Sequence, residues 1–189
     1  MDALRTGKLF CFIIFSVCLA QCTTSPSPSP SLQKELAYGK EAFDQGENGE
    51  AITHFTAYLA KVPGDADAHL KLGCALLKNE QLHEAVAQFK EAITLDPENE
   101  QSKQLIKNSI FTESLKFSEE NKLDTAIRYL MGYLTINSDD IDTHIRLARN
   151  FIKMGDTRDA IASVKHAASL DPRNPEVLEL LDYFAAGFH

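Results

Sequence analysis

The chain repeats itself at a spacing of 34 residues, and this repeat constrains the fold more than any other feature of the sequence. The matching pairs in the first half are Gly39 and Gly73, Ala51 and Ala85, Phe55 and Phe89, and Pro63 and Pro97. In the second half, Ala126 and Ala160 keep the same spacing. A recurring unit of this length is one supersecondary element that buries its apolar face against its neighbours. The sequence therefore predicts a stack of similar units.

The second unit shows what each unit contains. Gly73 and Ala85 are small residues, as two antiparallel helices need where they cross closely. Phe89 fills the seam between the helices, and Pro97 ends the second helix because proline cannot donate the next backbone hydrogen bond. Together with Leu72, Leu76 and Ala92, these residues resemble the signature of the tetratricopeptide repeat.

The resemblance implies an all-α fold, a right-handed α-solenoid of four helix-turn-helix repeats with a C-terminal capping helix. We expect a repeat domain over 32–188, with repeats at 32–65, 66–99, 107–140 and 141–174 and a capping helix at 175–188. The apolar residues of the last helix are expected to cover the open end of the stack. Residues 100–106 interrupt the period without Gly or Pro, so they are expected to lengthen the first helix of repeat three.

Turn residues support this register. Gly46 and Gly155 stand just after a first helix, where a left-handed residue is favoured, and Asn121 occupies the same place in repeat three. Repeat three otherwise departs from the pattern, because Ser114 replaces the packing Gly and Leu130 replaces the packing Phe.

The N-terminus is typical of an export signal, which we place at residues 1–21. Arg5 and Lys8 precede an uncharged run of 12 residues, 9–20. At 1.5 Å per residue this run is about 18 Å long as a helix, shorter than the roughly 30 Å hydrocarbon core of a bilayer. An uncleaved membrane anchor is therefore the weaker interpretation.

Residues 19–22, Leu-Ala-Gln-Cys, resemble the bacterial lipoprotein box, which implies that Cys22 is lipidated and begins the mature chain. Gln21 departs from the small residue usual before that Cys, so simple cleavage after Ala20 and soluble export stay open. In the linker at 22–31, Ser and Pro alternate from Ser25 to Ser31. Alternating prolines favour an extended polyproline II spacer, which would hold a domain away from the lipid headgroups.

Catalytic motifs are missing from the sequence. It contains no glycine-rich phosphate loop, HExxH, CxxC or GxSxG. His69 and His144 occupy equivalent positions in repeats two and four, where a core or seam role is favoured over metal binding. Cys74 is predicted to be a buried or groove-lining thiol, because no His is placed by spacing to activate it as a nucleophile. We expect neither an enzyme nor a small-molecule substrate, metal or other cofactor. The net charge of −8 also disfavours nucleic acid as a partner.

In the tetratricopeptide family, the first helices of the repeats line a concave groove. Mapped onto this chain, the predicted groove residues are Leu36, Lys40, Phe43, Leu70, Lys71, Cys74, Leu77, Lys78, Phe111, Leu115, Ile145, Arg146, Arg149, Ile152 and Lys153. Arg146, Arg149 and Lys153 share one helix face, and Asp142 is the only acid on that helix spaced to pair with one of them. An apolar groove with this basic bias suits a peptide with apolar anchors and some acidic residues. The alternative is that several of these apolar residues are buried in the seam between helices and that the Lys and Arg residues form a solvated face.

The resemblances together predict a lipid-anchored protein of the cell envelope, in the outer membrane and facing the periplasm, that binds another protein. The similar bacterial lipoproteins act as accessory factors in assembling envelope complexes. The alternative is a soluble exported chaperone that shields apolar segments of secreted proteins.

Overall fold

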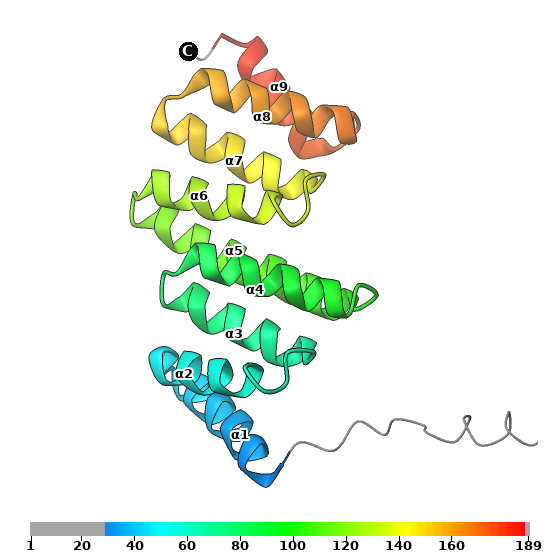
Figure 1. The fold of residues 1–189 in the computed structure, drawn as a ribbon. Helices are drawn as coiled ribbons and strands as arrows, with labels where there is room; N and C mark the ends of the chain where they lie inside the picture. The colour runs from blue at the N-terminus through cyan, green and yellow to red at the C-terminus, as the bar shows by residue number, and fades with distance from the viewer. Residues whose placement is uncertain (1–28, 188–189) are drawn as a thin grey trace, which may run out of the picture.

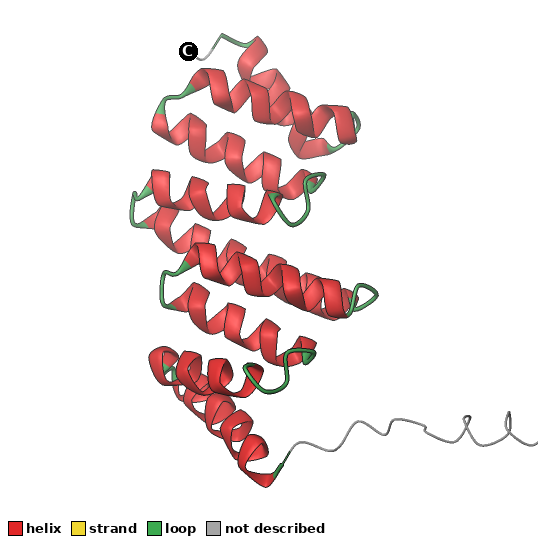
Figure 2. Ribbon diagram, in the orientation of Figure 1, coloured by secondary structure: helices red, strands yellow, loops and turns green. Residues whose placement is uncertain are grey.

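The computed structural model describes residues 29–187, and in this range it contains nine α-helices and no strand (Figure 2). The helices are α1 (Pro30–Gln45), α2 (Asn48–Leu59), α3 (Ala66–Lys78), α4 (Leu82–Leu95), α5 (Glu100–Glu119), α6 (Leu123–Leu134), α7 (Ile141–Met154), α8 (Thr157–Leu170) and α9 (Pro175–Ala185). The predicted all-α fold is confirmed.

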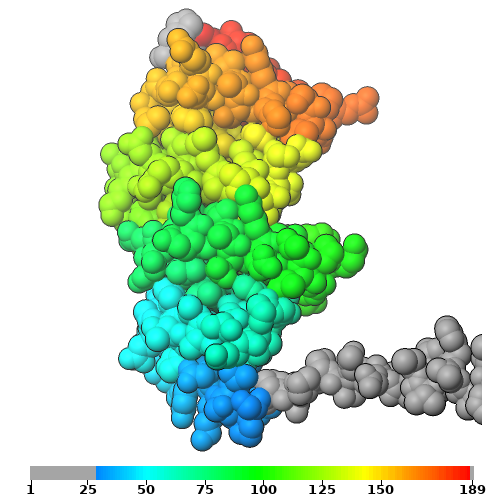
Figure 3. All heavy atoms as spheres, viewed as in Figure 1, coloured from blue at the N-terminus to red at the C-terminus, as the bar shows by residue number. Residues whose placement is uncertain are grey.

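The helices form four hairpins, α1–α2, α3–α4, α5–α6 and α7–α8, and α9 packs against α8 at the end of the stack (Figure 1). Neighbouring hairpins pack directly on one another, and the described atoms form one continuous column (Figure 3). The architecture is an α-solenoid, in which each hairpin buries its apolar face against the next.

Short polar side chains and left-handed residues set the helix ends. Asp65, Asn99 and Asp140 accept a hydrogen bond from the backbone N–H three residues later, at 3.0, 2.9 and 2.9 Å, and so cap α3, α5 and α7. Gly46 and Gly155 end α1 and α7 with φ of 80° and 83°, which confirms the predicted turns.

The first two hairpins are each held by a glycine on the first helix that lies against a phenylalanine on the second. A Cβ atom added at Gly39 would lie 2.9 Å from the Phe55 ring, and one at Gly73 would lie 2.5 Å from the Phe89 ring. These rings are fully buried, so the space that the glycines leave is filled. The glycine at this position is therefore required by packing within the hairpin.

Two helix ends differ from the predicted boundaries. α1 begins at Pro30, inside the predicted linker, because proline is tolerated in the first turn of a helix, and α9 ends at Ala185. α5 begins at Glu100 and has 20 residues, as expected from the insertion. The predicted signal peptide, Cys22 and most of the linker lie outside the described residues.

The capping helix covers the end of the stack with only one of its sides. Val177 and Leu180 are buried, but Leu178 and Leu181 are 46% and 38% exposed. The outer side of α9 therefore presents apolar side chains to the solvent, whereas a terminal helix with a polar outer side would not. No helix in the described part of the chain is both long and apolar enough to cross a bilayer.

Candidate functional site

The first helices of successive repeats contact one another directly and form one surface, which we call the first-helix face. Lys40 on α1 lies 3.4 Å from Asp67 on α3, and the Cys74 sulfur on α3 lies 3.7 Å from the Ser109 hydroxyl on α5. Lys153 on α7 donates a hydrogen bond of 3.0 Å to Ser118 on α5. These contacts join α1, α3, α5 and α7, the helices expected to form the groove.

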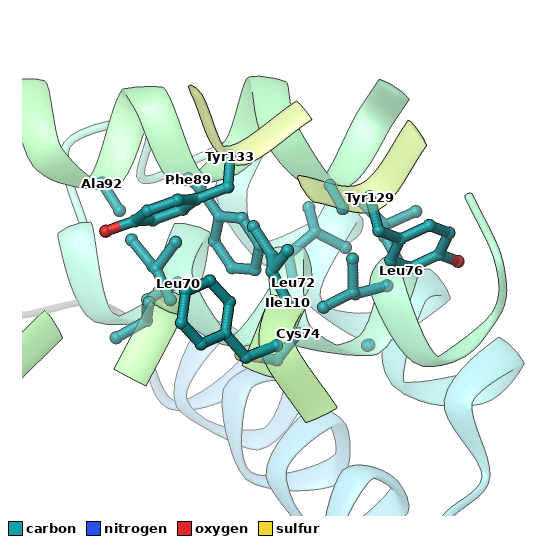
Figure 4. Packing of buried hydrophobic residues seen from close by; sticks show 14 of the residues in the cluster. Leu70, Leu72, Cys74, Leu76, Phe89, Ala92, Ile110, Tyr129 and Tyr133 are labelled. Carbon is teal, nitrogen blue, oxygen red and sulfur yellow. The ribbon is translucent and has the colours of Figure 1, made fainter. Parts of the chain in front are cut away.

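Five of the predicted groove residues are buried beneath this face. Leu70, Cys74, Leu77, Phe111 and Ile145 have exposed fractions between 1% and 9%. Figure 4 shows Leu70 and Cys74 within the packed cluster that also contains Phe89 and Ile110. They pack in the seam between helices, because neighbouring first helices lie close enough to cover them, and a partner has no direct access to them.

Other apolar groove residues are at least partly accessible. Leu36, Phe43 and Ile152 are half-buried, and the Lys78 ammonium lies over the Phe43 ring at 4.5 Å from its centre. Leu115 is 48% exposed and lies on α5 between Phe111 and Ser118, at helical spacing. Among the predicted groove residues, Leu115 is the most exposed large apolar side chain.

The cations at the N-terminal end of the face share one acid. Lys40 and Lys71 both approach Asp67, at 3.4 and 3.7 Å. All three side chains are solvent-exposed to a third or more, so these ion pairs contribute little to stability.

The cations of α7 are held in place by neighbouring helices. The Arg146 guanidinium lies 4.3 Å from the centre of the Phe111 ring, a cation–π contact. Arg149 forms a 2.9 Å ion pair with Glu176 on α9, a partner that spacing along α7 had not indicated. Together with Lys153, which bonds Ser118, they place three positive charges on the helix beside Leu115.

Lys107 was not among the predicted residues, although it joins α5 to α7. Its ammonium donates hydrogen bonds of 2.7 Å to both Asp140 and Asp142. Burial alone would lower the pKa of Lys107, but these two hydrogen bonds raise it above its ordinary value. Asp142 is therefore occupied by Lys107 rather than by Arg146. The two acids at the start of α7, Asp140 and Asp142, were the sequence signal, although a weak one, that a cation from a neighbouring helix pairs with them.

The titratable residues singled out from the sequence are packing residues. Burial raises the pKa of the Cys74 thiol, which disfavours the reactive thiolate. His69 contacts the Gln88 side chain at 2.7 Å and the Pro63 carbonyl at 3.0 Å, and His144 donates to the Ser138 carbonyl at 3.0 Å. In the described residues no group of three His, Cys, Asp or Glu side chains is arranged to hold a metal ion.

Four stacked helix hairpins, the first two with a glycine packed against a phenylalanine, define this chain as a helical repeat protein. Profiles of the tetratricopeptide repeat match residues 36–100 and 118–182, which together make up more than half of the chain. The chain belongs to the tetratricopeptide repeat family. Such repeats are generally non-catalytic modules for protein interaction, and the chain is a protein-interaction scaffold in this sense.

Individual relatives are distant. The chain is 25% identical to DnaJ homolog subfamily C member 3 of Bos taurus and to that of Homo sapiens, over 98% of this chain and 45% of each relative. It therefore spans less than half the length of these proteins.

Among solved structures, the MamA protein is 18% identical, with 83% of both chains covered and a TM-score of 0.44. YrrB, described as a TPR protein with an unusual peptide-binding site, is 16% identical, with 80% of this chain and 75% of that chain covered and a TM-score of 0.43.

Proposed function

We propose that this protein is an exported, lipid-anchored tetratricopeptide scaffold of the cell envelope that binds a partner protein through its first-helix face. The partner segment is a peptide with an apolar anchor and acidic residues. Cys22 carries the lipid, and the protein resides in the outer membrane, facing the periplasm. The protein acts there as an accessory factor that helps to assemble an envelope complex.

The observation that carries the binding proposal is the arrangement around Leu115. This side chain is 48% exposed and lies on α5 between Phe111, which contacts Arg146, and Ser118, which accepts a hydrogen bond from Lys153. An apolar contact at Leu115 would supply affinity, and the cations would attract acidic residues and orient the peptide. Because Arg146 and Lys153 are held against α5, little side-chain freedom would be lost on binding.

The anchoring proposal depends on residues 1–31. The charged start, the apolar run and residues 19–22 support export and lipidation, and the Ser/Pro linker supports a spacer between membrane and repeats. Gln21 favours the second candidate, a soluble exported chaperone cleaved after Ala20. Both candidates use the same repeat surface and differ in where the protein is held.

Site-specific photocrosslinking in living cells tests the binding face. A photoreactive amino acid at position 115 should give a crosslinked adduct with one partner, and the same amino acid at position 95 should not. Leu95 is a matched control because it is also an exposed leucine, at 38%, and lies on α4, a second helix outside the first-helix face. Equal crosslinking at both positions, or none at position 115, would contradict the proposed face.

A further inference from the structure

The junction between repeats two and three is packed differently from the other junctions. Elsewhere the second helix of one repeat packs against the first helix of the next, as α2 does on α3 and α6 does on α7. Here α4 contacts α5 less extensively, while α3 also packs against α5 and α4 contacts α6 directly. Residues 100–106 are about two helical turns, so they move repeat three about 10 Å along the α5 axis while keeping its faces in register.

This arrangement leaves a groove between α4 and α6, on second helices and separate from the first-helix face. The groove has a volume of about 890 Å³. Its apolar lining comes from Leu82, Val86 and Ala87 on α4 and from Met131 and Gly132 on α6. Met131 is 53% exposed, and a Cβ atom at Gly132 would lie 3.4 Å from both Leu82 and Val86, so the two helices approach closely there.

Charges along the groove indicate the direction of the occupant. Glu84 lies near the start of α4 and Lys90 two turns later, and neither forms a side-chain hydrogen bond or ion pair within residues 29–187. The α4 and α6 helices run in the same direction (Figure 1). A third helix antiparallel to both would place its first turn near Lys90 and its last turn near Glu84. Glu80, just before α4, also lines the groove at the Glu84 end, and Arg128 on α6 adds a cation to the lining. Acidic residues favour the first turn of a helix and basic residues the last, so Lys90 at one end and Glu80 and Glu84 at the other are complementary to such a helix.

We propose that the groove between α4 and α6 binds an amphipathic helix of a partner protein, antiparallel to α4, with an acidic first turn, a basic last turn and an apolar stripe over Met131. The groove is separate from the first-helix face, so the protein has two binding surfaces. Two parallel helices with an apolar floor accept a third helix in the helix-in-groove mode. The pair from Glu84 to Lys90 spans about 9 Å, within the length of a helix of about 15 residues.

The test uses a designed helical peptide of about 15 residues with this charge order and apolar residues at i, i+4, i+7 and i+11, labelled for fluorescence anisotropy. The protein, with residues 1–189, is titrated into the labelled peptide. Met131→Lys is expected to weaken binding at least tenfold. Met154→Lys is the matched control, because Met154 is 40% exposed and lies on α7, away from the groove. The affinity of this variant for the peptide should stay within twofold of wild type. Equal effects of the two substitutions would overturn the proposal.

Charge reversal tests the direction. A peptide with lysine first and glutamate last should bind wild type at least threefold more weakly, and the double variant Glu84→Lys with Lys90→Glu should restore its binding. Failure of this rescue would overturn the antiparallel orientation.

Hydrogen exchange should show peptide-induced protection of α4 and α6. Protection of α5 and α7 alone would assign the peptide to the first-helix face instead. If the wild-type protein forms a dimer and Met131→Lys dissociates it, the occupant of the groove is a second copy of this chain and the proposed partner helix is wrong.

Discussion

Glu80 adopts a left-handed backbone conformation, with φ of 62°, at the turn that joins the two helices of repeat two. The equivalent turns use Gly46 and Gly155, and repeat three uses Asn121 with φ of 58°. Glycine and asparagine adopt this conformation at low cost, whereas a side chain such as Glu is strained there. Repeat two therefore has the least favourable residue of the four turns.

Replacing Glu80 by glycine is expected to stabilise the protein by about 0.5–1 kcal/mol, because relief of strain exceeds the added freedom of the unfolded chain. Chemical denaturation of wild type and variant measures the change. As a control, Gly155→Ala should destabilise by about 1 kcal/mol, since it introduces the same strain. If Glu80→Gly instead lowers the unfolding free energy, the contacts of the Glu80 side chain stabilise the protein by more than the strained backbone at this position destabilises it.

Residue-level burial also predicts a dependence of stability on pH. Burial is the main cause that lowers the pKa of His144 below its ordinary value, and the nearby His166 ring lowers it further. The Ser138 carbonyl, Asp139 and Asp140 act in the opposite direction without reversing the shift. The neutral form is therefore favoured in the folded protein. Its contribution is fully present above the unfolded pKa of about 6.5 and is lost as the pH falls through the lower folded pKa.

Between pH 7 and pH 5, the unfolding free energy of wild type should fall more steeply than that of His144→Gln. Denaturant titrations at several pH values compare the slopes. The exposed His83, replaced in the same way, serves as the control and should leave the wild-type slope unchanged. Identical slopes for wild type and His144→Gln would assign the pH dependence to other groups.

At the scale of elements, the two helices of each hairpin are matched in size at one crossing point. Repeats one and two pair a glycine with a phenylalanine, whereas repeat three pairs Ser114 with Leu130 and repeat four pairs Ala148 with Val164. All four members of the last two pairs are buried, with exposed fractions of 3% or less. The departures in repeat three thus compensate each other, since a larger residue on one helix meets a smaller one on the other.

A double-mutant cycle tests this compensation. Gly73→Ser should destabilise the protein by about 1–3 kcal/mol, because the added atoms meet the Phe89 ring. Phe89→Leu alone should also destabilise, by leaving a cavity. Together the substitutions reproduce the pair of repeat three, and the double variant should be more stable than the sum of the single effects by at least 0.5 kcal/mol. Strict additivity would mean that the two positions do not share one space.

Features set by neighbouring residues were predictable from the sequence. The 34-residue period located the helix hairpins, and Gly46 and Gly155 marked left-handed turns, because turn and crossing chemistry depends on local residue type. The extension of α5 followed from helix-forming residues without Gly or Pro. These features need no knowledge of how one repeat lies on the next.

Features set by the offset between repeats were not predictable. The burial of Phe111 and Ile145 depends on how closely neighbouring first helices approach, and the ion pair of Arg149 with Glu176 joins helices from different units. The groove beside Met131 depends on the shift that the insertion produces in three dimensions. The position of a residue within its repeat indicates on which face of the helix it lies. How deeply its side chain is buried, and which residues it contacts, depend on how the repeats stack.

At the scale of the whole molecule, the stack separates two surfaces. The first-helix face has cations beside Leu115, and the opposite helices carry the groove between α4 and α6. Leu115 on α5 and Met131 on α6 belong to the same repeat, but their side chains are about half exposed and lie on separate surfaces without a shared partner. Substitutions at Leu115 and at Met131 are therefore expected to act independently, and the two proposed partners are expected to bind at the same time.

Holding these surfaces at a membrane requires an anchor, and Cys22 is the residue proposed to carry it. Two or more acyl chains give stable membrane residence, whereas one chain alone binds reversibly. Cys22→Ser should therefore move the protein from the membrane fraction to the soluble fraction after a high-salt wash. The repeats should stay folded, with unchanged helical circular dichroism and melting temperature, because α1 begins only at Pro30.

Cys74→Ser is the control that should leave the fractionation unchanged, since this thiol is buried in the stack. A Cys22→Ser variant that remains in the membrane fraction would refute lipidation at this residue, and a wild-type protein already in the soluble fraction would favour the exported chaperone.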